Sequence, residues 1–249
     1  MGRQKSQQTS GNVSSSQNAR RLGGTLFIVG TPIGCPDDLT LRARAILEQV
    51  SIVAAETPLV TRALLDYHGI GAASITGYGR GDEEKIAILL DRLKAGLDIA
   101  LVSDSGMPVI YDPGRLLIAA ARAAGHRVTV IPGPSALTAA AALSGYDGDR
   151  LLFIGRLPHS TSQLDRFFRQ LAREAGTTVL FAPPSVVSRL LERLRRLLPG
   201  RRVTLIVNMT KADEQLYEGS AGKLLKGVPL FPMDSEVTLV LPGARKKRR

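Results

Sequence analysis

Three short loops of glycine, proline and small polar residues carry the chemistry that this sequence of 249 residues could perform. They are residues 30–34 (GTPIG), 103–108 (SDSGMP) and 132–136 (PGPSA), and each follows an apolar run that predicts a strand. Glycine lets a ligand approach the backbone, proline fixes the loop, and Ser135 precedes a predicted helix whose first N–H groups are free. Tight turns alone could explain one such loop, but three in one half of the chain favour a small-molecule site.

The sequence lacks the motifs of several other catalytic classes. It contains no G-x-x-x-x-G-K-[ST] phosphate loop and no G-x-S-x-G nucleophile turn. The glycine-rich residues 77–81 lead into three acidic residues, which would repel a phosphate. A single cysteine, Cys35, excludes a disulfide framework, and three scattered histidines argue against a clustered metal site. A small organic ligand held mainly by backbone groups is therefore the preferred interpretation of the three loops.

Strand-like and helix-like runs alternate along the chain and must position these loops. Short β-rich runs at residues 25–29, 51–55, 98–103 and 126–131 are each followed by a segment with helical character. The same alternation restarts after residue 150. Alternating strands and helices predict an α/β fold with mostly parallel sheets covered by helices on both faces. In such sheets ligands bind beyond the carboxyl ends of the strands, where the three loops lie.

The turn at residues 145–150 divides this pattern into two α/β domains. We predict an N-terminal domain over residues 23–145 and a C-terminal domain over residues 150–243. Residues 1–22 are rich in Ser, Gln and Asn and predict a disordered tail, and residues 244–249 form a basic tail. The sequence contains no run of 18 apolar residues and no secretory segment, so we expect a cytoplasmic protein.

Positive charge is concentrated in one segment of the chain and in the two tails. The net charge is +11, and residues 150–202 contain eleven arginines against three acidic residues. Arg189, Arg193 and Arg196 are spaced to share one face of a predicted helix at residues 185–198, opposite a leucine stripe. Such a face suits a phosphate-rich partner, although a merely solvated helix would show the same pattern. We predict that these three arginines bind RNA.

The order and spacing of a series of motifs resemble those of the tetrapyrrole methylase superfamily, the class III S-adenosylmethionine-dependent methyltransferases. The resemblance spans about residues 24–243 and is greatest to bacterial enzymes that methylate a ribose 2′-hydroxyl of a cytidine in small-subunit ribosomal RNA. The matching motifs are residues 31–34 (TPIG), 55–56 (AE), 103–108 (SDSGMP), 112–114 (DPG), 132–136 (PGPSA), 210–211 (TK) and 214–219 (EQLYEG).

The resemblance implies two unlike α/β domains with a cleft between them that holds S-adenosylmethionine. It also implies ribosomal RNA or a small ribosomal subunit as the partner, and a homodimer, which is common in the superfamily. Carried over by position, the residues that bind the cofactor would be Pro32, Asp104, Ser105, Gly106, Met107, Ile110, Ser135 and Ala136.

Several substitutions set this chain apart from the ribosomal RNA enzymes that it resembles. Residues 57–59 (TPL) stand where those enzymes usually have Asp-Thr-Arg, and Met107 stands where they have Thr. Residues 182–185 (APPS) replace Glu-Ser-Pro-His, and residues 78–81 (YGRG) replace a loop that is normally rich in His, Glu and Asn. The motifs that would bind the cofactor thus match the family more closely than the positions that would contact the substrate.

The chemistry of methyl transfer indicates which side chains to examine. Transfer from a sulfonium is an in-line displacement, so the protein mainly aligns the acceptor and receives its proton. A ribose hydroxyl is a weak acid that would profit from a general base, and Glu56 and Asp104 are the candidates at strand ends. Lys211 could act electrostatically. Glu56 could instead make only a local cap or ion pair.

Three functions remain open from the sequence. The first is methylation of ribosomal RNA, with the arginine-rich segment and the tails holding the RNA. The second is methylation of a tetrapyrrole, although the absence of Trp and a 4% aromatic content argue against a deep aromatic pocket. The third is a non-catalytic protein that binds RNA or ribosomes, which the missing Asp-Thr-Arg motif would favour.

Overall fold

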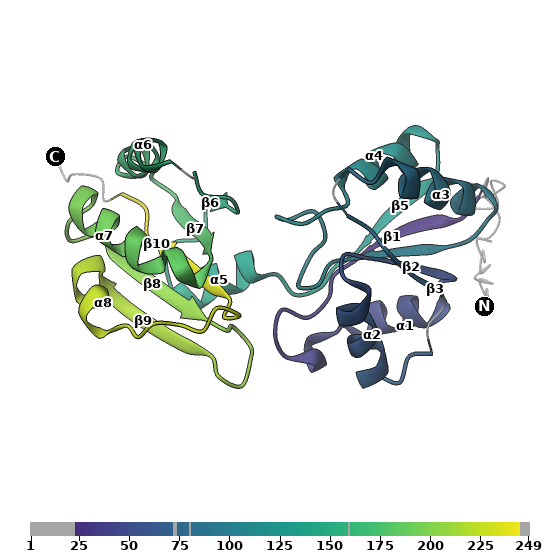
Figure 1. The fold of residues 1–249 in the computed structure, drawn as a ribbon, viewed down its shortest axis with the longest axis horizontal. Coiled ribbons are helices and arrows are strands. Elements are labelled where there is room, and N and C mark those ends of the chain that lie inside the picture. Colours follow the sequence, from purple (N-terminus) through teal and green to yellow (C-terminus); the bar gives the residue numbers. More distant parts are fainter. Residues whose placement is uncertain (1–22, 72–73, 80, 159, 245–249) are drawn as a thin grey trace, which may run out of the picture.

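Two five-stranded sheets, each with its own helices, make up the part of the chain that the computed structural model describes, residues 23–71, 74–79, 81–158 and 160–244 (Figure 1). This arrangement confirms the α/β class and the two unlike units predicted from the sequence. Of the predicted tails, residues 1–22 and 245–249 lie outside the described residues. No helix within the described ranges is long and apolar enough to cross a membrane.

The first sheet is entirely parallel, with the strand order β3-β2-β4-β1-β5. Its central strand β4 is buried at every residue, which explains why such a strand has a continuous apolar sequence. The strands are β1 (Thr25–Val29), β2 (Ile52–Ala55), β3 (Ser74–Gly77), β4 (Ile99–Val102) and β5 (Arg127–Ile131).

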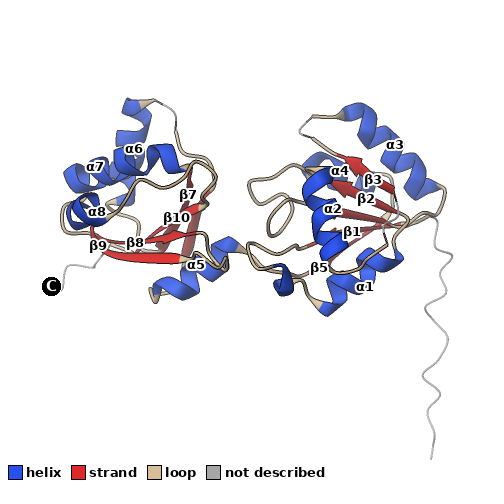
Figure 2. Ribbon diagram, turned by 60° about the horizontal axis from the view of Figure 1, so that its bottom comes forward, coloured by secondary structure: helices blue, strands red, loops and turns tan. Residues whose placement is uncertain are grey.

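Four helices cover the two faces of this sheet (Figure 2). Two of them pack on one face, with Leu47 in the core, and the other two pack on the opposite face, with Leu117 in the core. The hydroxyl of Thr40, the N-cap of the first helix, accepts a hydrogen bond from the Ala43 N–H at 3.1 Å. The helices are α1 (Leu41–Gln49) and α2 (Pro58–Tyr67) on one face, and α3 (Glu83–Lys94) and α4 (Arg115–Ala123) on the other, with a 3-10 turn η1 (Pro36–Asp38) before α1.

The second sheet is mixed and has the strand order β6-β7-β10-β8-β9. Only β6 and β7 are parallel, and the other three neighbouring pairs are antiparallel. The strands are β6 (Leu151–Ile154), β7 (Thr177–Ala182), β8 (Arg202–Val207), β9 (Gln215–Ser220) and β10 (Val237–Leu241).

The second sheet differs from the predicted mostly parallel arrangement because of where the last strand inserts. Helix α7 (Val187–Leu197) joins β7 to β8 as a crossover, and these two strands run in the same direction. Strand β10 lies between them and is antiparallel to both, so that Leu239 pairs with Leu180 on one side and Leu205 on the other. Strand β9 follows β8 through a short hairpin connection. Strand β9 is not apparent from the sequence because this edge strand is polar and largely exposed.

Helices also cover both faces of the second sheet. On one face, α6 (Thr161–Leu171), α7 and α8 (Ala221–Gly227) enclose a core around Phe168. On the other face, α5 (Ala136–Ser144) packs through Ala140 against Val179 and Ile206 (Figure 1). The small side chains of α5 allow this close approach. Because α5 lies with the second sheet, we propose that the domain boundary falls at residues 132–135, ahead of the sequence-based position at 145–150.

Candidate active site

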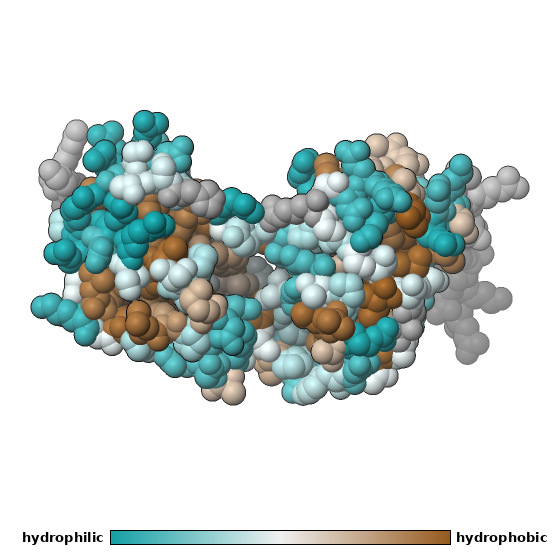
Figure 3. All heavy atoms as spheres, viewed as in Figure 1, coloured by the Kyte–Doolittle hydropathy of each residue, from teal (hydrophilic) through white to brown (hydrophobic). Residues whose placement is uncertain are grey.

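A cavity of ≈340 Å³ lies between the two sheets, next to the loops that follow β1, β4 and β5. Figure 3 shows the molecule narrowed and hollowed where the two units meet. The wall is largely apolar and is built from both units. The first unit contributes Ile33, Ser105, Gly106, Met107, Ile110, Tyr111 and Asp112, and the start of α5 contributes Ser135, Ala136 and Leu137. The second unit contributes Phe181, Ala182, Pro183, Met209, Ser235, Glu236, Val237 and Thr238.

The three loops singled out in the sequence meet at this cavity. The Thr31 N–H donates to the Gly106 carbonyl at 2.9 Å, and the Gly106 N–H donates to the Pro32 carbonyl at 3.3 Å. The third loop joins them through glycine packing, because a Cβ on Gly30 would lie 2.8 Å from the Gly133 Cα. Backbone groups therefore hold the loops together at the ends of the strands, as expected for a parallel sheet.

The cavity fits the cofactor that the resemblance implies. Gly106 has a φ of +76°, and a Cβ there would lie 3.2 Å from Ile33 Cγ2, so the wall leaves room only for a backbone at this point. Ser135 does not cap α5 with its side chain, and the first N–H groups of this helix suit an anionic group. Asp112 and Glu236 lie on the same wall and suit a cationic group. S-adenosylmethionine combines a carboxylate, a cationic sulfur and an extended apolar surface.

Strained backbone conformations gather beside the cavity. Among the described non-glycine residues, positive φ angles occur at Val109 (77°), Tyr111 (79°), Asn208 (52°) and Thr210 (63°). The first two belong to the loop between β4 and α4, and the other two belong to the connection between β8 and β9, which contributes Met209 to the wall. Each such conformation costs about 1–3 kcal/mol and persists where surrounding contacts enforce it, which is typical of functional sites.

Most of the predicted cofactor-binding residues lie on the cavity wall. Pro32 is buried and immediately precedes the wall residue Ile33, and Asp104 immediately precedes the wall residue Ser105. The second unit contributes wall residues such as Phe181 and Met209, which the sequence does not reveal because they come from strand ends far apart in the sequence and share no motif. The predicted residues on the wall are Ser105, Gly106, Met107, Ile110, Ser135 and Ala136.

Glu56 and Asp104, the two carboxylates predicted as candidate bases, lie side by side at the ends of β2 and β4. The Asp104 N–H donates to Glu56 Oε2 at 3.4 Å, and the Thr57 N–H donates to Asp104 Oδ1 at 2.9 Å. Both side chains belong to half-buried residues, and neither lines the cavity. Lys211 belongs to the second unit, where its Nζ lies 3.6 Å from Oε1 of the wall residue Glu236. No group of three or more His, Cys, Asp or Glu side chains in the described ranges could hold a metal ion.

Two of the three arginines predicted to bind RNA are held by an acidic residue of the neighbouring helix. Arg193 Nη1 and Arg196 Nη2 each lie 2.5 Å from a carboxylate oxygen of Asp165 in α6. The Arg193 side chain is only 14% exposed, so the structure does not present it to a partner as the sequence predicted. The Arg196 side chain remains 59% exposed, and Arg189 is exposed. Helical spacing alone could not reveal Asp165, which belongs to another helix.

Burial shifts the pKa of two further groups. It raises the pKa of the Tyr78 hydroxyl, just after β3, so this group stays protonated at neutral pH. Burial also lowers the pKa of Arg201, which follows α7 and donates hydrogen bonds to the carbonyls of Leu171, Glu174 and Pro242. Arg201 therefore stabilises the second unit, and the exposed positive surface comes from other arginines.

Comparisons with known proteins identify the family of this chain. The family described as Tetrapyrrole (Corrin/Porphyrin) Methylases matches residues 25–225. The chain is 34% identical to the ribosomal RNA small subunit methyltransferase I of Thermotoga maritima, over 88% of this chain and 99% of that protein. It is 39% identical to the protein of the same name from Xylella fastidiosa, over 81% of this chain and 74% of that protein.

Solved structures of the same fold include enzymes of tetrapyrrole synthesis. A cobalt precorrin-4 methyltransferase has a TM-score of 0.66 and 19% identity, covering 88% of this chain and 94% of its own. The uroporphyrin-III C-methyltransferase of Thermus thermophilus, complexed with S-adenosyl homocysteine, has a TM-score of 0.63 and 19% identity, covering 88% and 97%. At this level of identity the likeness concerns the fold.

Proposed function

The chain belongs to the tetrapyrrole methylase family and is an S-adenosylmethionine-dependent methyltransferase, and from this premise we propose that it methylates a ribose 2′-hydroxyl in small-subunit ribosomal RNA. The observation that carries the proposal is the similarity to ribosomal RNA small subunit methyltransferases, which for the Thermotoga maritima protein extends over nearly its whole length. The arginine-rich second unit supports the same substrate, because RNA binding depends on neutralising phosphates.

Different residues of the cavity wall would contact different parts of the methyl donor. The backbones of residues 105–107 and 134–136 would contact it closely, because Gly106 has no side chain at the wall and the first N–H groups of α5 have no side-chain cap. Ile33 and Met209 would cover its apolar part, and Asp112 would offset positive charge. The donor supplies a methyl group on a cationic sulfur, which makes that methyl group electrophilic.

The acceptor hydroxyl must lose its proton as the new oxygen–carbon bond forms and the sulfur–methyl bond of the donor breaks, which leaves S-adenosyl homocysteine. We infer that Asp104 receives this proton, since it directly precedes the cavity wall and its Oδ1 is fixed by the Thr57 N–H. Glu56 accepts the Asp104 N–H and so acts as a positioning residue. Lys211 positions the wall carboxylate of Glu236 from the second unit.

Transfer to the ribose can be tested directly. Purified protein and labelled S-adenosylmethionine should label the RNA of small ribosomal subunits from a strain that lacks the modification. A 2′-O-methyl group blocks alkaline cleavage of the following phosphodiester bond, so alkali should release the label in a dinucleotide. Label in mononucleotides would indicate a methylated base instead. Label on a uroporphyrin-type substrate alone would favour a tetrapyrrole enzyme, and RNA binding without any transfer would favour a non-catalytic protein.

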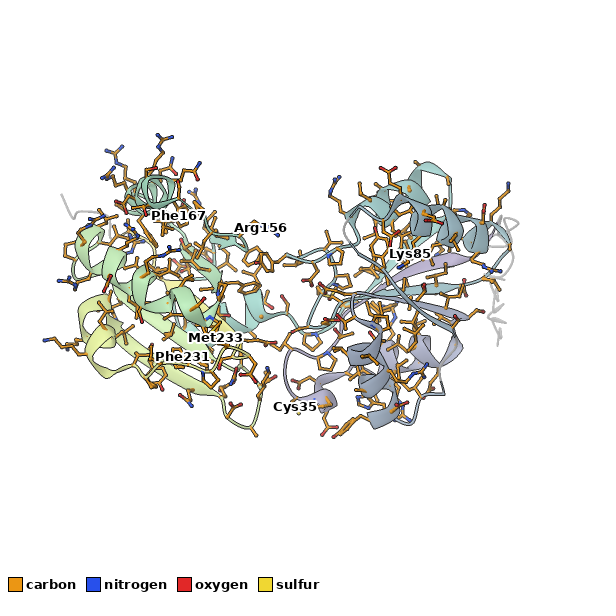
Figure 4. The ribbon with its side chains drawn as sticks, in the orientation of Figure 1. Cys35, Lys85, Arg156, Phe167, Phe231 and Met233 are labelled. Carbon is orange, nitrogen blue, oxygen red and sulfur yellow. The ribbon has the colours of Figure 1, made fainter. Side chains whose placement is uncertain are left out.

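Helix α6 provides the positive surface that the structure leaves open. Arg166, Arg169 and Arg173 are exposed, and their spacing places them on one side of α6 and its C-terminal end. Within the described residues none of the three forms a salt bridge, unlike Arg193. Side chains with blue nitrogen tips project from α6 into solvent in Figure 4. We propose that this surface contacts RNA phosphates and adds affinity without reading sequence.

Replacing Arg166, Arg169 and Arg173 with Gln is expected to weaken RNA binding and lower the slope of log Kd against log salt by about two, since three phosphate contacts are lost. Filter binding at several salt concentrations measures this slope. The matched control removes the same charge at the amino end of the first sheet, through Arg92→Gln, Arg122→Gln and Arg127→Gln. Equal slopes for the two triple variants would mean that only net charge matters.

We propose that the protein acts in the cytoplasm with ribosomal subunits, and that it forms a homodimer. Leu41 at the start of α1 and Leu59 at the start of α2 are 87% and 81% exposed, and a second subunit would cover such side chains. Light scattering that returns 26.6 kDa at micromolar concentration would instead show a monomer.

A further inference from the structure

A second hollow, of ≈330 Å³, adjoins the cavity and shares Tyr111 and Asp112 with it. Its other walls include Val109 from the same loop and Leu116 from α4. The Tyr111 side chain therefore stands at the border between the two spaces. We propose that this second hollow receives the acceptor nucleotide, with its base stacked on Tyr111 and a phosphate held by Arg156. This inference rests on the RNA methylation proposed above.

Tyr111 is held across the space between the two units. Its φ of 79° fixes a strained loop conformation, and its ring meets Phe181 edge-on at 6.3 Å between centroids. A Cβ on Gly155 would lie 2.8 Å from Tyr111 Cδ2, so glycine at that position admits the ring. The residue nevertheless remains 43% exposed. A partly exposed aromatic ring that is held in place and lines two hollows is prepared to stack against a flat ligand.

Arg156 places a positive charge beside this ring from the second unit. Its guanidinium carbon lies 5.6 Å from the centroid of the Tyr111 ring, and the residue is exposed just after β6. Figure 4 shows Arg156 on the side of the second unit that faces the first. An arginine next to an exposed aromatic ring is the combination that binds single-stranded nucleotides, because the ring stacks on the base and the arginine binds phosphate.

The position of the hollow matches what transfer to a ribose requires. An enzyme that modifies one nucleotide of a folded RNA must turn it out of its stack, and stacking on a protein ring offsets part of that cost. A base in the second hollow would leave its ribose where the two spaces meet, next to the methyl donor. Arg115 lies at the rim of this hollow and adds a second positive group for the RNA backbone.

The absence of Trp from the chain gives a direct test of stacking. Tyr111→Trp creates a single tryptophan at the site, and Tyr217→Trp places the matched control on β9, at the opposite edge of the second sheet. With S-adenosyl homocysteine present, unmethylated small-subunit ribosomal RNA should quench the fluorescence at position 111 about twofold or more. It should leave position 217 unchanged. Full RNA binding by filter assay without quenching at position 111 would overturn the proposal.

Kinetics separate a stacking role from a structural one. Tyr111→Leu and Arg156→Gln should each raise KM for the RNA about tenfold. After Arg156→Gln, whose side chain does not line the donor cavity, the Kd for S-adenosylmethionine by calorimetry should stay within about twofold. Tyr111→Phe keeps the ring and should recover the lower KM, and Arg150→Gln at the other end of β6 is the charge-matched control for Arg156→Gln. Tyr111→Leu could instead leave the KM for RNA unchanged and either weaken donor binding or lower the Tm. The Tyr111 ring would then only pack between the two units and would not bind RNA. If the wild type transfers no methyl group to RNA, the proposed function fails, while the tryptophan experiment still reports whether a base stacks at position 111.

Discussion

Gly106→Val is expected to lower the affinity for S-adenosylmethionine by at least about 100-fold, or ~2.7 kcal/mol, while the protein remains folded. Gly106 lies on the cavity wall, and its Cβ would already stand 3.2 Å from Ile33 Cγ2 and 3.5 Å from the Pro134 carbonyl oxygen. A valine there must displace these neighbours or extend into the space of the cofactor. Calorimetry with the donor measures the loss, and a thermal melt shows that the variant folds.

Backbone strain alone must be separated from this steric effect. Gly96 follows α3 with a φ of +88° and has no atom within 4 Å of its ideal Cβ position. Gly96→Val therefore carries a comparable conformational cost, about 1–2 kcal/mol of folding stability, without approaching the cavity. It should bind the donor like the wild type. Unchanged affinity in a folded Gly106→Val protein would remove residues 105–107 from the cofactor site.

The sequence predicts most of the strands and helices of the first unit because their signals are local. A parallel strand buried on both faces is a continuous apolar run, as in β4, and a capping residue such as Thr40 acts on the turn that follows it. The loops of the cavity directly follow such strands, so their glycines and prolines could be assigned to strand ends. For the same reason most of the predicted cofactor residues lie on the cavity wall.

The second unit could not be predicted in the same way because its arrangement depends on distant pairing. Nothing in the sequence of β10 indicates that it inserts between β7 and β8, since periodicity identifies a strand but not its neighbours. The wall residues Phe181, Met209 and Glu236 become neighbours only through that insertion. Asp165 similarly reaches Arg193 through the packing of α6 on α7, which the spacing of arginines within one helix does not encode.

Asp104→Asn is expected to lower kcat by about 100- to 10,000-fold, since a general base contributes a rate factor of this size. The asparagine keeps an oxygen that can accept the Thr57 N–H, at the place where Asp104 Oδ1 accepts it at 2.9 Å. The loop therefore keeps its hydrogen bond and loses only the carboxylate that would receive a proton. Single-turnover transfer to unmethylated small ribosomal subunits measures the rate, and calorimetry should return an unchanged Kd for S-adenosylmethionine.

Glu56→Gln is the matched variant, because it also removes one carboxylate and keeps an acceptor for the Asp104 N–H. We expect it to lower kcat about tenfold or less, since Glu56 positions the backbone of Asp104 and does not receive the proton. A reversed order, with the larger loss in Glu56→Gln, would assign the base to Glu56. Asp104→Ala removes the oxygen that accepts the Thr57 N–H, whereas Asp104→Asn removes only the charge. If Asp104→Asn keeps the wild-type kcat and Asp104→Ala loses donor affinity, the Asp104 side chain only holds the loop.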